Sequence, residues 1–174
     1  MIKPIIEKQL DQQEKTFGVS LDYIRHILRT SFSSFFKFGL FMPLAQHRNK
    51  LPLDAFAVAR IVATRDEDCG TCVQLEVNEA RRQGVSAKVI QSVLDNAPDT
   101  LPSELATIYH FTRAVIEQTG TEETYRTSIQ EKWGEEAVVE LALAIGSSRL
   151  FPIVKRSLGY ATSCSLVEIQ VKGG

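Results

Sequence analysis

"LPLDAFAVARIVATRDEDCGTCVQLEVNEARRQG", residues 51–84, decides the fold of this 174-residue chain. Its first half places apolar residues at near-helical spacing until the charged letters "RDED" interrupt the pattern. A second helix is expected to continue from Cys72 to Gly84, because glycine ends a helix readily in the left-handed conformation. The stretch therefore predicts two helices joined by a turn, and that turn ends at a Cys-x-x-Cys sequence.

The rest of the chain shows the same helical spacing, and no alternating run stands out except "SLVEIQV" (165–171) near the end. Ser20 and Ser86 precede apolar helical stretches and are predicted to cap them. Pro152 is expected to interrupt or kink the last helical stretch. No repeat or linker divides the chain, so the sequence predicts one compact all-α domain over residues 1–174.

The composition and net charge of the chain bear on whether it binds nucleic acid or membranes. Hydrophobic residues make up 44% of the chain, charged residues 24%, and the formal net charge is −1, which predicts neither a nucleic-acid nor a membrane partner. The N-terminus shows no signal-peptide pattern, and the most apolar region, residues 32–45, is too short to span a bilayer. We therefore expect a cytoplasmic protein, in which a close Cys pair is more often catalytic or metal-binding than structural.

The Cys pair falls where a helix begins. Cys69 is expected at the end of the turn and Cys72 in the first helical turn. Unpaired N–H groups at a helix N-terminus stabilise a thiolate and so lower a thiol pKa from its ordinary value of about 8.5. A second sulfur three residues away can condense with an oxidised first one to form a disulfide. The three carboxylates of residues 66–68 act in the opposite direction by raising a thiol pKa, and Arg65 offsets only part of their effect.

Two other interpretations of the pair stay open at this point. Cys is often buried as a small apolar residue, so the pair can serve packing alone. A zinc site needs two more ligands at short spacing, whereas Cys164 is remote and His26, His47 and His110 are scattered singly. No haem, flavin, nucleotide or metal motif is visible, and no bound cofactor is predicted.

The local pattern resembles the alkylhydroperoxidase D/carboxymuconolactone decarboxylase family, whose members show C-x-x-C-x-x-x-H-x-x-x-A-x-x-x-G before a short capped helix. Cys69, Cys72, Ala80 and Gly84 have the expected spacing, and "VSAKVIQSVL" takes the place of the short helix. The resemblance covers roughly residues 32–160. It implies a compact all-helical fold that assembles into homo-oligomers, as a trimer, a hexamer or a dimer.

The same resemblance implies an activity. In the peroxidase branch the second cysteine attacks a hydroperoxide and the first resolves the sulfenic acid, so Cys72 would be peroxidatic and Cys69 resolving. An external thiol or dithiol donor is also implied, because one Cys-x-x-Cys pair cannot reset itself. Decarboxylase members generally lack the Cys pair, which argues against that activity here.

This chain departs from the family pattern at its proton relay. Glu76 stands where the family has histidine, one helical turn from Cys72 and on the same helix face. The family's peroxidases also use a glutamate about a dozen residues before the first cysteine, a spacing that falls on Ala57. Asp54 is the nearest acid in that helix, and His110 is a further candidate if it folds toward Cys72.

Glu76 has two alternative roles, a catalytic acid or base and a surface charge. An ordinary Glu is a poor base for an ordinary thiol, because their pKa values differ by about four units, or roughly 5–6 kcal/mol for the proton transfer. If burial raised its pKa, Glu76 would act as a general acid on the departing hydroxide or alcohol. The alternative is a helix-surface charge that pairs with Arg60, Arg65 or Arg81.

The sequence thus predicts a thiol-dependent oxidoreductase that reduces hydroperoxides or exchanges disulfides, with weak peroxidase activity because the relay is incomplete. A non-catalytic helical oligomer with a redox-sensing or structural Cys pair is the second hypothesis. The third is a cofactor-free lyase or isomerase with Glu76 as base. The Phe-rich segment "FSSFFKFGLF" (32–41) is assigned to a core or subunit interface rather than to a substrate pocket.

Overall fold

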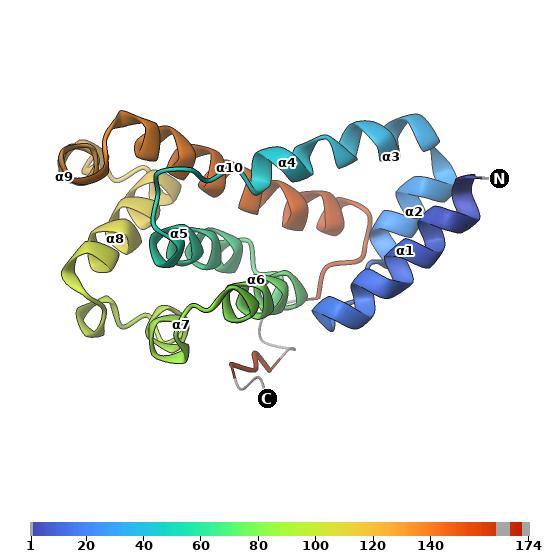
Figure 1. Ribbon diagram of the computed structural model, residues 1–174, viewed down its shortest axis with the longest axis horizontal. Coiled ribbons are helices and arrows are strands. Elements are labelled where there is room, and N and C mark those ends of the chain that lie inside the picture. The colour runs from blue at the N-terminus through green and yellow to red at the C-terminus, as the bar shows by residue number, and fades with distance from the viewer. Residues whose placement is uncertain (1, 163–167, 172–174) are drawn as a thin grey trace.

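Helices make up the regular structure of residues 2–162 and 168–171, which the computed structural model describes (Figure 1). No strand occurs in those residues, so the predicted all-α fold is confirmed. The elements are α1 (Ile2–Phe17), α2 (Asp22–Thr30), α3 (Phe32–Gly39), α4 (Phe41–Ala45), α5 (Leu53–Asp66), α6 (Gly70–Gln83), α7 (Ala87–Leu94), the 3-10 turn η1 (Pro98–Thr100), α8 (Ser103–Glu117), α9 (Glu122–Trp133) and α10 (Glu135–Ser157).

Helix α5 is the centre of the core. It packs against α6, α7, α8 and α10, and Figure 1 shows it between them. Its residues from Ala55 to Ala59 and from Ile61 to Thr64 are all buried, so the helix is covered on every side. Alanines recur along it and allow neighbouring helices to approach closely. The two helices predicted from residues 51–84 are therefore α5 and α6, and the buried α5 supports the start of α6, where the Cys pair lies.

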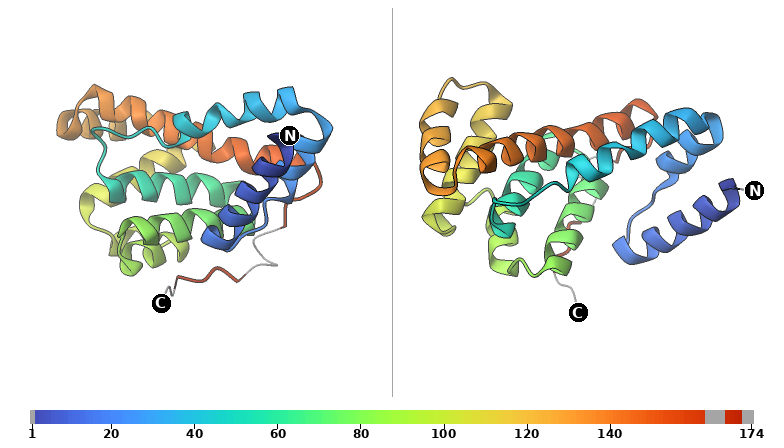
Figure 2. Two further views of the ribbon diagram at one scale, coloured as in Figure 1. Left: turned by 45° about the vertical axis from the view of Figure 1, so that its right-hand side comes forward. Right: turned by 45° about the horizontal axis from the view of Figure 1, so that its top comes forward.

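Helix α10 runs along one side of the core and beside α4 (Figure 2). Pro152 lies inside this helix and does not interrupt it, so the first of the two expected effects, an interruption, is wrong. Among the described residues α10 is the one helix long and apolar enough to cross a membrane, by length and composition only. Half of its most apolar window is buried inside the protein.

Several predicted helix boundaries are confirmed. Ser86 caps α7, because its hydroxyl accepts the N–H of Val89, and Gly84 ends α6 with a left-handed φ of 102°. The predicted Ser20 cap is wrong, because Leu21 occupies the cap position of α2. The Ser20 hydroxyl accepts the N–H of Asp22, the first residue of that helix. Both of these serines therefore accept a hydrogen bond from a backbone N–H at the start of a helix.

The alternating run near the C-terminus lies partly outside the described residues, and residues 168–171 form no strand. The backbone of Gln170 is instead paired with the side chain of Gln74. The Gln74 amide accepts the Gln170 N–H at 2.7 Å and donates to its carbonyl at 2.9 Å. The segment around Gln170 is thereby attached to α6.

Helices α1 to α4 form an outer layer beside α6 and α10. Leu10, Leu21, Tyr23 and Leu28 make up a second, smaller core under this layer. Figure 1 shows α1 and α2 at the end of the molecule opposite α8 and α9. The space enclosed between this layer and the main core contains the site described next.

Candidate active site

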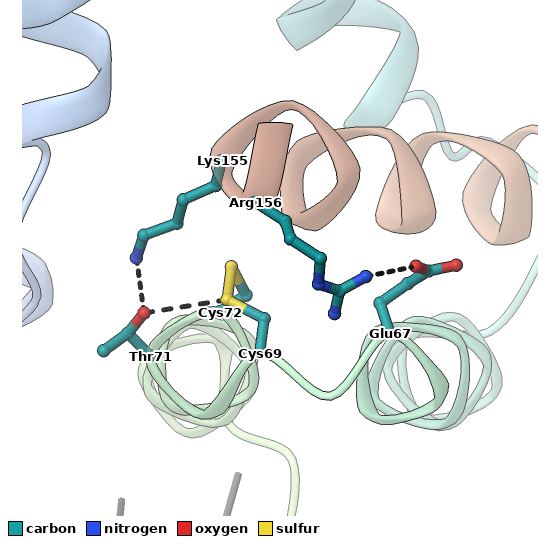
Figure 3. Close-up of a disulfide and its surroundings, with 6 residues drawn as sticks. All are labelled: Glu67, Cys69, Thr71, Cys72, Lys155 and Arg156. Carbon is teal, nitrogen blue, oxygen red and sulfur yellow. Dashed lines mark hydrogen bonds and ion pairs between the residues drawn. A yellow bond between two sulfur atoms is a disulfide. The ribbon is translucent and has the colours of Figure 1, made fainter. Parts of the chain in front are cut away.

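The Cys pair lies at the start of α6, as predicted. Cys69 occupies the N-cap position and Cys72 the first turn, with their sulfur atoms at disulfide bonding distance and their Cα atoms 5.3 Å apart (Figure 3). Cys69 is fully buried, whereas Cys72 is partly exposed and lines a cavity. A molecule in the cavity can therefore reach the sulfur of Cys72 but not that of Cys69.

The cavity has a volume of about 370 Å³ and lies between the core and the outer layer. Polar side chains of the core helices line it at Arg60, Thr64, Thr71, Ser148 and Lys155. Apolar side chains contribute most of the remaining wall, among them Leu10, Phe35, Phe38, Leu75 and Phe151. Two phenylalanines of the 32–41 segment, Phe35 and Phe38, therefore line this cavity. The sequence analysis had placed that segment in a core or subunit interface instead.

Lys155 is connected to the Cys pair through Thr71, and the sequence analysis did not identify it. The residue is 6% exposed, and its Nζ donates to the hydroxyl of Thr71, which lies 3.7 Å from the Cys69 sulfur (Figure 3). Burial lowers the pKa of Lys155, and the smaller effect of the Asp22 charge raises it. A lysine with a lowered pKa is suited to proton transfer.

The acidic turn before the Cys pair is paired more fully than the sequence suggests. Glu67 is buried, and its carboxylate accepts from Arg149 at 2.6 Å and from Arg156 at 3.4 Å. Asp66 lies 3.5 Å from Arg149. Arg65, the one cation considered from the sequence, donates to the end of α7 instead. Cations of α10 therefore reduce the repulsion that these carboxylates exert on a thiolate.

Glu76 is held by an arginine of α5. Arg60 donates to its two carboxylate oxygens at 2.7 and 2.6 Å, and the side chains are 14% and 11% exposed for Arg60 and Glu76. The guanidinium also donates to the carbonyl of Ala45 and lies 5.3 Å from the ring centre of Phe56. Of the three arginines proposed as partners, Arg60 is therefore the one that pairs. Such a bidentate pair fixes the position and orientation of the Glu76 carboxylate.

The other candidates for the family relay lie elsewhere. Ala57 is buried in the core, and Asp54 is in the first turn of α5, outside the cavity lining. His110 stacks against Tyr125 with ring centres 5.8 Å apart, on α8 rather than near α6. Neither Asp54 nor His110 is brought to Cys72. Cys164 lies outside the described residues.

Comparisons with known proteins add no support to the family resemblance. No family model, curated protein or solved structure matches this chain. The resemblance to alkylhydroperoxidase D proteins therefore rests on the Cys-x-x-Cys sequence and its flanks, while the all-α fold rests on the structure.

Proposed function

We propose that this protein is a thiol-dependent oxidoreductase that reduces hydroperoxides or exchanges disulfides through Cys72 and Cys69. One observation carries the proposal: the two sulfurs lie at bonding distance, with Cys72 facing a cavity of about 370 Å³ and Cys69 buried behind it. A reactive cysteine needs access, and its resolving partner needs proximity. The arrangement supplies both.

The oxidising half of the cycle runs from the reduced pair. The Cys72 thiolate attacks one peroxide oxygen, an S–O bond forms, the O–O bond breaks, and the departing alkoxide takes a proton to give the alcohol. The Cys69 thiolate then attacks the Cys72 sulfenic acid, so that a disulfide forms and hydroxide leaves as water. The two protons that these leaving groups take are those that the two thiols lose.

The reducing half requires an external dithiol. One donor thiolate attacks the Cys72 sulfur, the Cys69–Cys72 bond breaks, and Cys69 departs as a thiolate. The second donor thiolate then attacks the donor sulfur of this mixed disulfide, so that Cys72 leaves as a thiolate and the donor becomes a disulfide. Thr71 is placed to donate its hydroxyl proton to the buried sulfur of Cys69, while Lys155 donates to the Thr71 oxygen. In this proposal the Lys155–Thr71 pair does the work of the missing Glu–His relay, and Glu76 positions Arg60.

The oligomeric state and the location belong to the same proposal. Large apolar side chains are exposed along α3 and α4, at Phe32, Phe36, Leu40, Phe41 and Met42. An exposed apolar strip of this kind favours a protein interface. We therefore propose that the protein forms a homo-oligomer, as a dimer, a trimer or a hexamer. From the sequence pattern we also propose that it lies in the cytoplasm and belongs to the alkylhydroperoxidase D-like family.

The test compares wild-type protein with Cys72→Ser and Cys69→Ser. We expect turnover of cumene hydroperoxide or of a small disulfide with a dithiol donor, abolished in Cys72→Ser. Reduced Cys69→Ser should still consume one equivalent of peroxide and then stop at the sulfenic acid, because the resolving thiol is absent. In Cys69→Ser/Cys164→Ser protein, alkylation of Cys72 should give an apparent pKa below about 7.5.

Two outcomes would contradict the proposal. An apparent Cys72 pKa above about 9 together with no turnover would favour the non-catalytic redox-sensing or structural protein. An activity that survives serine at both positions would favour the cofactor-free lyase or isomerase.

A further inference from the structure

We propose that the cavity binds a single-chain amphiphile with an anionic head group, such as an alkyl carboxylate. The head would lie at Thr64, Ser148 and Lys155, and the chain would lie along the apolar wall that α3 contributes. The binding needs no redox turnover, so it stands apart from the activity proposed above.

Two buried hydroxyls indicate where a polar ligand atom binds. Thr64 and Ser148 are each 1% exposed and both line the cavity. Neither hydroxyl has a hydrogen-bond partner in the part of the chain that the structure describes. A buried polar side chain without a partner is unfavourable and uncommon in native proteins. Ligand oxygens that accept from these hydroxyls would satisfy them.

Lys155 supplies the charge that fits an anion. It lies seven residues after Ser148 in α10, two helical turns along the same face, and both line the cavity. Its Nζ donates to Thr71 and lies 5.7 Å from the Tyr23 ring centre, and no carboxylate pairs with it among the described residues. Burial lowers the Lys155 pKa, so a nearby anion would stabilise its charged form.

The other charged groups of the lining are already paired. Glu76 binds Arg60 through both carboxylate oxygens, and Glu79 is hydrogen-bonded to Arg82, which holds the pKa of Glu79 below its ordinary value. An entering anion therefore meets one buried cation without a carboxylate partner, while the carboxylates that would repel it are neutralised.

Size and wall chemistry select an alkyl chain. A volume of about 370 Å³ is at the small end of ligand pockets, which run from about 300 to 1,000 Å³. The wall is mostly apolar and includes Phe35, Phe38, Met42, Leu75 and Phe151. Such a surface offers few partners to a sugar or nucleotide, whereas flexible Met and aromatic side chains fit a hydrocarbon chain well.

Calorimetric titration of the oxidised protein with decanoate, below its micelle concentration, tests the proposal. We expect saturable binding of one decanoate, weakened about tenfold or more in Lys155→Met, because the methionine keeps the apolar stem and removes the charge. Lys88→Met, at an exposed position of α7, is the control for net charge and should bind as wild type does. Butyrate and decylamine should bind at least tenfold more weakly than decanoate.

Further variants keep the test decisive if Lys155→Met folds poorly. Ser148→Ala should weaken decanoate binding several-fold, whereas a purely apolar cavity would bind at least as tightly without the hydroxyl. Cys69→Ser/Cys72→Ser should retain binding, which separates this proposal from the redox activity. Absence of decanoate binding, equal binding to Lys155→Met, or equal binding of decylamine would overturn it.

Discussion

At the scale of single residues, Glu76 shows how a side chain's partner decides its role. Its position one turn after Cys72 suggested a general acid. A general acid has to carry a proton, whereas Glu76 accepts two N–H bonds from Arg60. That pair bridges α5 and α6 within the cavity lining, and it offsets a negative charge in the neighbourhood of Cys72. We infer that the pair is structural and electrostatic.

A double-mutant cycle checks this role. Glu76→Gln and Arg60→Met should each lower the free energy of unfolding by about 2–4 kcal/mol, because each leaves a largely buried charge without its partner. The double variant should lose clearly less than the sum, as measured by urea denaturation. If Glu76→Gln left stability unchanged and abolished hydroperoxide reduction, the result would contradict the structural role and support Glu76 as a general acid.

At the scale of secondary-structure elements, one buried carboxylate fixes where α5 begins. Glu140 of α10 is fully buried and accepts the backbone N–H groups of Asn49, Lys50 and Leu51 at 2.7 to 3.1 Å. Burial raises the pKa of Glu140, but these backbone hydrogen bonds outweigh it and hold that pKa below its ordinary value. The loop is thereby fastened to the helix that packs against α5.

Glu140→Gln should lower the free energy of unfolding by about 2 kcal/mol, because an amide replaces a charged acceptor of three N–H groups and brings in a donor that has no acceptor there. Glu136→Gln, an exposed change in the same helix, should leave stability within about 0.5 kcal/mol of wild type. Urea titrations of both variants make the comparison. Equal stability of the two would show that the Glu140 contacts contribute nothing net.

The contrast between α6 and α10 shows what sequence can and cannot predict here. The limits of α6 follow from local rules, since a glycine ends it and the Cys pair begins it. Within α10, however, the stretch "AVVELALAIG" carries Glu140, whose partners lie about ninety residues away, and "FPIVKRSLGYA" carries Lys155, whose partner Thr71 is in another helix. No local spacing connects such pairs. Pro152 continues the helix because neighbouring turns and tertiary packing outweigh its missing N–H.

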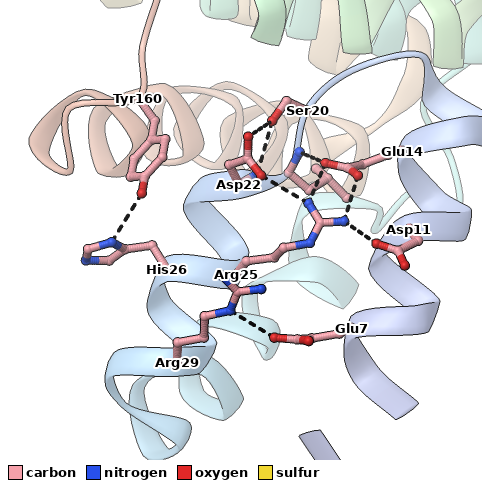
Figure 4. Close-up of polar contacts among 10 residues, drawn as sticks. Glu7, Asp11, Glu14, Ser20, Asp22, Arg25, His26, Arg29 and Tyr160 are labelled. Carbon is pink, nitrogen blue, oxygen red and sulfur yellow. Dashed lines mark hydrogen bonds and ion pairs between the residues drawn. The ribbon is translucent and has the colours of Figure 1, made fainter. Parts of the chain in front are cut away.

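At the scale of the whole molecule, the N-terminal layer completes the cavity. Side chains of α1 and α2 form part of its lining, including Ile6, Leu10 and Tyr23. Figure 4 shows how the two helices are joined: Arg25 of α2 donates to both Glu14 oxygens and to Asp11 of α1, each at 2.6 Å. Ligand access to Cys72 and Lys155 therefore depends on this ion-pair cluster as well as on apolar packing.

Acid should loosen α1 through Glu14. Hydrogen bonding to Arg25 lowers the pKa of Glu14 from 4.5 to about 2. Because the pKa is depressed in the folded protein, the resulting stabilisation is present above about pH 4.5 and is lost as pH falls toward 2.

Hydrogen exchange of α1 amides, corrected for intrinsic rates, measures this loss. Protection should fall roughly tenfold over that interval, which is less than the full pKa shift implies because solvent screens the exposed ion pair. Glu14→Gln should remove most of this pH dependence, whereas Glu131→Gln, an exposed change in α9, should preserve it. An unchanged pH profile in Glu14→Gln would show that α1 is held by its apolar contacts alone.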